Sequence, residues 1–412
     1  MSRTSGAGPT CHDGEVPSFS PFPGLRYRPD LDPAAVTAPP YDVIDEADRA
    51  ELAARSERNV VHLDLPLDVD GGDRYERAAA TLADWVADGT LVRDPRPSFT
   101  VYRMTYRDDR GRPARTLGVI GALELTRPEE GRILPHEHTT KKARTDRLDL
   151  LRATCHNLSA VWMLSMTEGL TGLLERDDEP DAEWTDDEGT THAVWRVDDP
   201  DTVAAIADAV DRTPVVVADG HHRYETSLAH RDERRGRAAG AVELASDRLM
   251  ALVVELDEDE LCVRPIHRLV DGTGPDEVVA LLTAAGFEPA GPVGAAAVAD
   301  GTVLTRLDEV GGVAVVGPDG SAVLLRAPDG DVLDSARLAD ALGEAPGVAL
   351  RYQHGVDHVV AAVSGGDAAA GVLIRPATVA RIDANARAGE RMPPKTTYFH
   401  PKPRTGIVIR PC

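Results

Sequence analysis

The chain has 412 residues, of which 42% are hydrophobic and 4% aromatic, and its formal net charge is −24. This length and apolar fraction can supply the cores of two or three domains, built mainly from Val, Leu, Ile and Ala. The strong negative charge repels a phosphate backbone and argues against general nucleic-acid binding.

The cysteines and the hydropathy pattern indicate the compartment. Cys11, Cys155, Cys262 and Cys412 lie far apart and form no CxxC pair, which argues against a structural zinc site and a disulfide framework. No apolar run approaches the roughly 18 residues of a membrane span, and the N-terminus lacks a signal-peptide pattern. We therefore expect a cytoplasmic protein without a membrane partner, in which residues 1–16 form a flexible leader.

The first part of the chain predicts an α+β layer. Pro and Gly interrupt residues 21–29 and 38–44, which we expect to be loops. Apolar periodicity then predicts, in chain order, a helix at 45–55, a strand at 60–65, a helix at 74–88, and a hairpin of strands at 99–106 and 116–125.

The middle of the chain continues this layer and contains several polar segments. We expect a loop at 136–140, a helix at 146–154, an acidic solvated stretch at 175–189, a strand at 192–197, a helix at 202–209, a strand at 215–218, and paired strands at 250–256 and 261–266.

From Gly272 the composition shifts to Ala, Gly, Val and Asp, which predicts a smaller α/β module. Its expected elements, with those that follow it, are helices at 276–285, 335–342, 356–363 and 376–388, a hairpin over 313–326, and strands at 371–374 and 406–409. The predicted organisation is a main α+β domain at 17–271, the module at 272–380, and a basic tail at 381–412 that returns to the main domain.

The most informative motif is the turn after the predicted strand at 215–218, because four polar side chains meet a helix start there. Gly220 permits the turn, and His221, His222 and Arg223 begin a helical pattern. A helix start offers unpaired N–H groups and the positive end of its dipole, so these residues are candidate phosphate ligands. The alternative is that Asp219 only caps the helix.

The lysines point to two further segments. Only four of 45 basic residues are lysine, and they lie in two short polar stretches: Lys141, Lys142, Lys395 and Lys402. Residues 381–410 carry seven basic residues against two acidic ones, which suits a small anionic ligand. Lys142, Arg144, Lys395 and Lys402 are therefore candidate phosphate-binding residues, with chance clustering as the alternative.

Phosphoryl transfer to a hydroxyl group also needs a carboxylate base. The candidates are Asp42, Glu137 and Asp219, with His138 as a further catalytic candidate. Asp42 and Glu137 rank ahead, because Asp219 can be occupied in shaping its turn. A Mg²⁺ ion held mainly by the phosphates of a nucleotide or polyphosphate would be the cofactor.

Two other functions use the same residues. His136, His138, His221 and His222 could form a metal-dependent hydrolase or phosphatase, although no HExxH spacing is present and nearby cations oppose a metal. A non-catalytic sensor of a phosphorylated ligand is the third class. Tyr398 and its neighbours Phe399 and His400 could stack on a ring or simply pack.

The motifs together resemble a known family, the prokaryotic domain of unknown function 1015. The similar segments are PFPGLRY, APPYDVI, RNVVHLDLP, the HEHT segment, DRLDLLRAT, VVVADGHHRYETSL and MPPKTTYFHPKPRTG. The resemblance covers most of the chain, but the name of this family implies no particular reaction. The chain has neither GxxxxGK[ST] nor GxGxxG, so a nucleotide would be bound by neither a P-loop nor a dinucleotide fold.

The turn at residues 219–223 is also similar to the Gly-x-x-Arg turn of the ParB and sulfiredoxin superfamily, which includes free-serine kinases. That resemblance implies an α+β fold with a mixed sheet core and a phosphate-binding turn. No helix-turn-helix is evident, and no residue matches a motif for the early glutamate of the amino-acid kinases. We therefore expect a phosphotransferase for a small hydroxylated metabolite, with serine as the boldest choice; the oligomeric state stays open.

Overall fold

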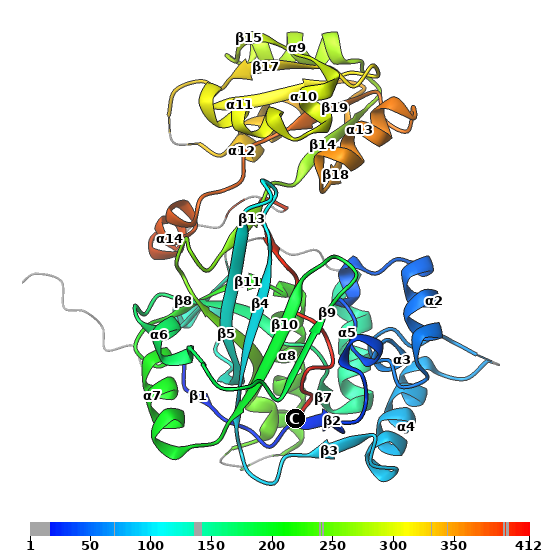
Figure 1. Cartoon of the computed structure of the whole chain (residues 1–412), viewed down its shortest axis with the longest axis vertical. Coiled ribbons are helices and arrows are strands. Elements are labelled where there is room, and N and C mark those ends of the chain that lie inside the picture. Colours follow the sequence, from blue (N-terminus) through cyan, green and yellow to red (C-terminus); the bar gives the residue numbers. More distant parts are fainter. Residues whose placement is uncertain are drawn as a thin grey trace, which may run out of the picture.

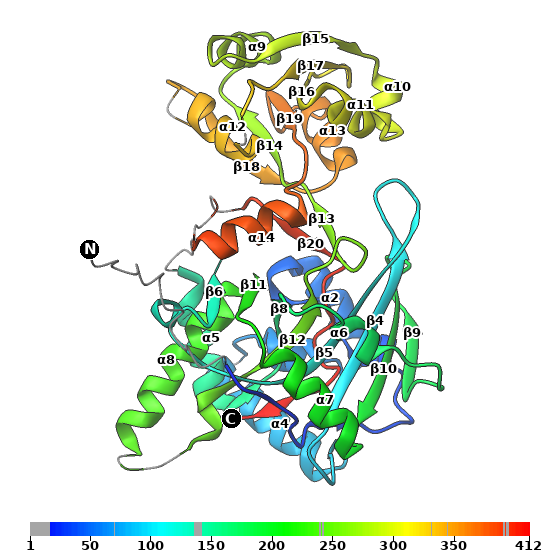
Figure 2. The same ribbon diagram turned by 90° about the vertical axis from the view of Figure 1, so that its left-hand side faces the viewer.

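The computed structural model describes residues 17–69, 71–135, 142–238, 240, 243–330, 332–343, 345–389, 392 and 395–412, and the predicted leader at 1–16 lies outside this part. The chain forms a mixed nine-stranded sheet and a separate antiparallel six-stranded sheet (Figure 1). Residues 256–266, which include the short strand β13 (Cys262–Arg264), join the last strand of the main sheet to β14 (His267–Asp271) of the smaller one. The smaller body lies beyond one end of the main sheet in both views (Figures 1 and 2).

The main sheet has the strand order β6-β11-β8-β12-β5-β4-β10-β9, with β1 paired to β5. The pairs β6 with β11 and β8 with β12 are parallel, and the other pairs are antiparallel. Its strands are β1 (Phe19–Ser20), β4 (Phe99–Arg107), β5 (Pro113–Glu124), β6 (Ile133–Pro135), β8 (Val161–Ser165), β9 (Ala182–Thr185), β10 (Thr191–Val197), β11 (Val215–Asp219) and β12 (Arg248–Glu255).

Strand β11 shows how this sheet is buried on both faces. Val215 and Val217 face a core that contains Ile206 of α7 (Pro200–Val210) and Tyr224 of α8 (His221–Arg237). Val216 and Ala218 face a second core, which includes Phe399 of the C-terminal segment. Successive side chains of a strand point to opposite faces, so a continuous apolar run is what a strand covered on both sides requires.

Shorter elements surround the main sheet. The helices are α1 (Pro33–Val36), α2 (Glu46–Arg55), α3 (Val61–Asp64), α4 (Arg74–Ala87), α5 (Lys142–Thr154) and α6 (Leu170–Leu174), with 3-10 turns η1 (Tyr41–Val43), η2 (Pro128–Glu130) and η3 (Ala245–Asp247). Strands β2 (Leu25–Tyr27) and β3 (Leu91–Arg93) pair with each other. Among the described residues, no helix combines the length and apolar composition needed to cross a bilayer.

The smaller sheet has the order β15-β17-β16-β19-β14-β18 and carries helices on both faces. The sequence predicted an α/β module here, and every strand pair is antiparallel. Its further elements are α9 (Pro275–Ala284), β15 (Glu288–Val293), α10 (Ala295–Ala299), α11 (Thr302–Val310), β16 (Gly312–Val316), β17 (Ala322–Arg326), α12 (Asp334–Leu342), β18 (Ala349–Gln353), α13 (Val356–Ser364) and β19 (Ala370–Leu373). Strand β14 belongs to this sheet, although 267–271 fell in the predicted main domain; the domain boundaries stay a prediction.

After α14 (Val379–Ala388) the chain runs back along the main sheet, as the red trace in Figure 1 shows. Strand β20 (Tyr398–His400) pairs with β13, and β21 (Arg410–Pro411) pairs with β7 (His156–Asn157). Phe399 packs against Trp162 of β8, with ring centroids 5.6 Å apart. The C-terminal segment is therefore part of the packing of the main sheet.

Strongly periodic segments are confirmed as predicted. They include the helices at 45–55, 74–88, 146–154 and 202–209 and the hairpins at 99–125 and 313–326. Local caps explain two of the helix starts: Asp45 and Asp48 form a capping box for α2, and the carboxylate of Asp73 accepts from the first turn of α4.

The predicted strand at 60–65 is wrong, because residues 61–64 form the short helix α3. Buried Asn59 explains the difference. Its amide nitrogen donates to the carbonyls of Ala35 and Thr37, at 2.8 and 3.2 Å, and its side-chain oxygen accepts from the N–H of Val61 at 2.9 Å. This long-range anchor sets the backbone for a helical turn.

The predicted pairing of 250–256 with 261–266 is also wrong, because β12 lies between β8 and β5 while β13 pairs with β20. The carboxylate of buried Glu260 accepts from the N–H of Leu117 at 2.9 Å, which draws this loop onto β5. The predicted strand at 406–409 is interrupted, since Gly406 has φ +93° and the strand that follows is β21.

Candidate functional site

The strand-turn-helix predicted at residues 215–231 is present as β11, Gly220 and α8. Gly220 has φ +93°, a left-handed conformation that side chains disfavour. A Cβ atom there would also lie 2.9 Å from Nε of Arg223. Both the backbone and the neighbouring guanidinium therefore require glycine, and the positive end of the α8 dipole lies at this turn.

Asp219 is held by two cations. One carboxylate oxygen accepts from Nη2 of Arg223 at 2.9 Å, and the other forms an ion pair with Nζ of Lys402. Burial alone would raise the pKa of Asp219, but the charges of Lys402 and Arg223 hold that pKa far below its ordinary value. Asp219 is therefore an ionised hydrogen-bond acceptor and is unsuited to take up a proton at neutral pH.

Lys402 brings the C-terminal segment to this turn. Its side chain is 10% exposed, and its ammonium lies 4.6 Å from the ring centroid of Tyr398. Burial lowers the pKa of Lys402, while the charges of Asp219 and Asp42 outweigh that effect and raise it. Lys402 thus stays protonated between two carboxylates from distant parts of the sequence.

Asp42, Tyr398 and Lys402 border a cavity of about 590 Å³, which we call the Lys402 cavity. This size is in the range of small-molecule sites, roughly 300–1,000 Å³. Six carboxylates and three permanent cations line it. The charged lining residues are Asp42, Asp48, Glu51, Asp186, Asp187, Glu188, Arg55, Lys402 and Arg404.

The smaller body contributes His354 to the same cavity. This residue follows β18, and its ring centroid lies 4.0 Å from that of Tyr398. Burial lowers the pKa of His354 to about 4, helped by the charges of Lys402 and Lys395. His354 is therefore neutral at pH 7, and it places the smaller body beside the Lys402 cavity.

A second group of charges lies behind the turn, where α5 meets α8. Arg147 is buried and donates to both the carbonyl and the carboxylate of Asp64, at 2.8 and 3.1 Å. Its guanidinium also lies 4.2 Å from the ring centroid of Tyr41, and burial raises the pKa of that phenol to about 12. Tyr41 precedes Asp42, so this packing supports the loop that carries Asp42.

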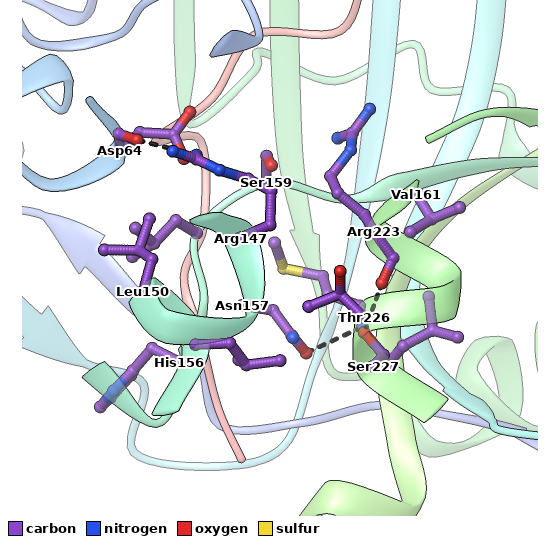
Figure 3. Close-up of a pocket in the computed structure, with 14 residues that line it drawn as sticks. Asp64, Arg147, Leu150, His156, Asn157, Ser159, Val161, Arg223, Thr226 and Ser227 are labelled. Carbon is purple, nitrogen blue, oxygen red and sulfur yellow. Dashed lines mark hydrogen bonds and ion pairs between the residues drawn. The ribbon is translucent and has the colours of Figure 1, made fainter. Parts of the chain in front are cut away.

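The cavity between α5 and α8 is too small for a nucleotide. It measures about 50 Å³, room for only a few water-sized groups. Figure 3 shows Arg147 and Leu150 on one side of it and Arg223, Thr226 and Ser227 on the other. The larger Lys402 cavity is therefore the better candidate site.

The predicted site residues fall into three groups. Asp42, Asp219, Gly220, Arg223 and Lys402 come together around the turn. The half-buried His221 and His222 begin α8, and Lys395 is exposed with its charge near His354. Glu137, His138, His136 and Lys141 lie outside the described residues, as do the side chains of Lys142 and Arg144 at the start of α5.

Arg223 is predicted to bind phosphate, but in the structure its guanidinium donates hydrogen bonds to other residues of the chain. Its Nη1 donates to the carbonyl of Ala160 at 2.5 Å, and its Nη2 donates to Asp219. A direct phosphate contact by Arg223 stays a prediction. Among the described residues, no three His, Cys, Asp or Glu side chains gather so that they could hold a metal ion; two of the four histidines of the hydrolase alternative lie outside that set.

Sequence reasoning missed several residues that build the site. Asp64 and Arg147 belong to the segments RNVVHLDLP and DRLDLLRAT, and Arg404 to the C-terminal PKPRTG, so those motifs were the available signal. His354 carries no such signal, because it reaches the cavity only through the placement of the smaller body.

A family model that matches most of the chain decides its kinship. The family model described as "Protein of unknown function (DUF1015)" matches residues 19–335. The chain belongs to the DUF1015 family. That match covers the loop of Asp42 and the Asp219 turn, whereas Lys402 lies beyond it. A search of proteins with curated function finds no match.

Solved structures give distant likenesses. A free serine kinase in complex with AMP is 17% identical, with 72% of this chain and 88% of that chain covered and a TM-score of 0.36. A conserved hypothetical protein from Pyrococcus furiosus is 14% identical, with 68% of this chain and 90% of that chain covered and a TM-score of 0.36. SbnI with a C-terminal truncation, from Staphylococcus aureus, is 11% identical, with 68% of this chain and 82% of that chain covered and a TM-score of 0.36. At such low scores these likenesses carry no argument about the site of this DUF1015 member.

The first prediction concerns the Asp219 turn. Gly220→Ala should lower the free energy of unfolding by about 1–2 kcal/mol or more, because φ there is positive and the new Cβ meets Arg223. The matched control is Gly236→Ala in the same helix, where the Cβ has open space and stability should rise by up to about 1 kcal/mol. Urea unfolding measures both, and equal effects of the two substitutions would contradict this account of the turn.

The second prediction concerns His354. NMR titration should give an imidazole pKa near 4, and Lys402→Met should raise it, because removing a nearby positive charge favours the protonated ring. Loss of the resonance in His354→Gln provides the assignment. A wild-type pKa near the ordinary 6.5 would mean that His354 does not face Tyr398 and Lys402 in solution.

Proposed function

We propose that this protein is a phosphotransferase that moves a phosphoryl group from a nucleotide or polyphosphate to a small hydroxylated metabolite at the Lys402 cavity. The single observation that carries the proposal is the position of Lys402. Its buried ammonium is paired with Asp219 beside the start of α8, and the charge of Asp42, which lines the same cavity, helps to raise its pKa. A fixed cation and an exposed carboxylate line this one cavity, and the cation is paired to the residue just before a helix start, an arrangement that suits phosphoryl transfer.

The roles follow from what each group can still do. Asp219 is occupied by two cations, so it positions Lys402 and does not act as the base. Asp42 is exposed on η1 and lines the cavity, so it is the base that would accept the proton of the acceptor hydroxyl. Lys402 would stabilise negative charge that develops on the transferred group.

The acidic lining of the Lys402 cavity limits which ligands can bind there. Six carboxylates against three permanent cations disfavour a bare polyphosphate. A donor that arrives with bound Mg²⁺ presents less negative charge, and the Mg²⁺ would supply charge neutralisation on the phosphates. An acceptor with an ammonium group, such as serine, also suits the acidic stretch Asp186–Glu188, which forms part of the lining.

The test is an incubation of the full chain with ATP, ADP or pyrophosphate, Mg²⁺ and a panel of hydroxylated metabolites that includes serine. A phosphorylated acceptor should be detected by ³¹P NMR and mass spectrometry. Asp42→Asn should lower turnover by about 10²–10⁴-fold, the usual loss for a general base, while nucleotide binding is kept. Glu46→Gln, an exposed change outside the cavity on the neighbouring helix α2, is the control and should leave turnover unchanged.

The possible outcomes separate the competing functions. Release of phosphate without a phosphorylated acceptor would favour the hydrolase hypothesis. Nucleotide binding without turnover would favour a sensor. Absence of both binding and turnover with all three donors would overturn the proposal.

A further inference from the structure

A second cavity is bordered by the same C-terminal segment, two residues after Arg404. It measures about 370 Å³ and is bordered by residues 26–37, by the segment around β3, by β9 and β10, and by Gly406 and Ile407. We call it the Trp184 cavity. It shares no lining residue with the Lys402 cavity, so a ligand here would be separate from the proposed reaction.

The wall of the Trp184 cavity is largely apolar. Trp184 is 8% exposed and stacks on His192, with ring centroids 5.0 Å apart. Its indole Nε1 is buried and donates no hydrogen bond to any residue that the structure describes. Val92 is 51% exposed at the rim. The cavity therefore meets the apolar body of Trp184 and the exposed Val92, while the indole nitrogen is buried away from it.

The lining holds more arginines than carboxylates, although the chain as a whole is strongly acidic. Four arginines line the cavity against two aspartates. Both aspartates are engaged: Asp94 accepts from Nε of Arg26 at 2.9 Å, and Asp181 accepts from the backbone N–H of Arg196. Arg28 and Arg196 also form ion pairs, with Asp30 at 3.0 Å and Asp198 at 4.0 Å, whereas Arg93 forms no ion pair with any described residue and is the cation left for a ligand. The four arginines are Arg26, Arg28, Arg93 and Arg196.

We propose that the Trp184 cavity binds a small organic acid with an aromatic or apolar body. The body would lie against Trp184 and the aliphatic wall, and the carboxylate would meet the arginines of the rim. The volume falls in the range of small-molecule sites, about 300–1,000 Å³. Charge complementarity favours an anion, because the rim is positive in a protein whose net charge is −24.

The probe for this site is naphthalene-1-acetate, with its neutral amide, naphthalene-1-acetamide, as the matched ligand. Calorimetric titration of the full chain should show that the acid binds at least about tenfold more tightly than the amide, the scale of one charge-assisted hydrogen bond. Quenching of tryptophan fluorescence gives a second readout, because Trp184 is in the wall.

The test variant is Val92→Asp, which adds a negative charge to the rim. It should weaken binding of the acid by at least about tenfold. Val86→Asp on α4 is the control: Val86 is similarly exposed, at 44% against 51%, and does not line the cavity. If Val92→Asp fails to fold, Arg93→Gln tests the same rim. Equal binding of acid and amide, or equal weakening by the two Val→Asp variants, would overturn the proposal.

Discussion

The ion pair between Lys402 and Asp219 is the interaction on which the candidate site depends. The two side chains are 10% and 16% exposed, and charges so far removed from water are tolerated only when they are paired. The pair joins the end of β11 to a segment 183 residues later in the chain. It therefore holds the C-terminal segment, which lines the Lys402 cavity, against the turn that begins α8.

The apolar packing of the same segment supports this arrangement. Phe399 lies against Trp162, and β20 pairs with β13 in an antiparallel two-stranded sheet. Beyond Lys402, Arg404 donates to the carbonyl of Thr37, and its side chain is 9% exposed. The C-terminal segment thus borders two cavities of different character: one rich in carboxylates, the other apolar with an arginine rim.

Local sequence signals predicted much of the fold. Apolar periodicity and caps were sufficient for α2, α4 and the hairpin of β4 and β5. They failed for residues 61–64, because Asn59 is anchored by carbonyls more than twenty residues earlier. They failed again for the partners of β12 and β13, because Glu260 bonds to β5 instead of ending a hairpin. Both failures come from contacts between segments far apart in sequence.

The site shows the same limit. Asp42, Asp219 and Lys402 could be singled out because their motifs and the scarcity of lysine mark them. Arg223 donates hydrogen bonds to Ala160 and Asp219. The sequence could not predict the first of these, because Ala160 lies 63 residues away. His354 was missed because only the position of the smaller body brings it to Tyr398.

The most direct measurement of the central claim is a double-mutant cycle of Lys402→Met and Asp219→Asn. Unfolding followed by tryptophan fluorescence reports on the main sheet and its surroundings, because Trp85, Trp162, Trp184 and Trp195 all lie there. The account predicts a coupling free energy of at least about 1 kcal/mol between the two residues. Effects that add to within about 0.5 kcal/mol would contradict it.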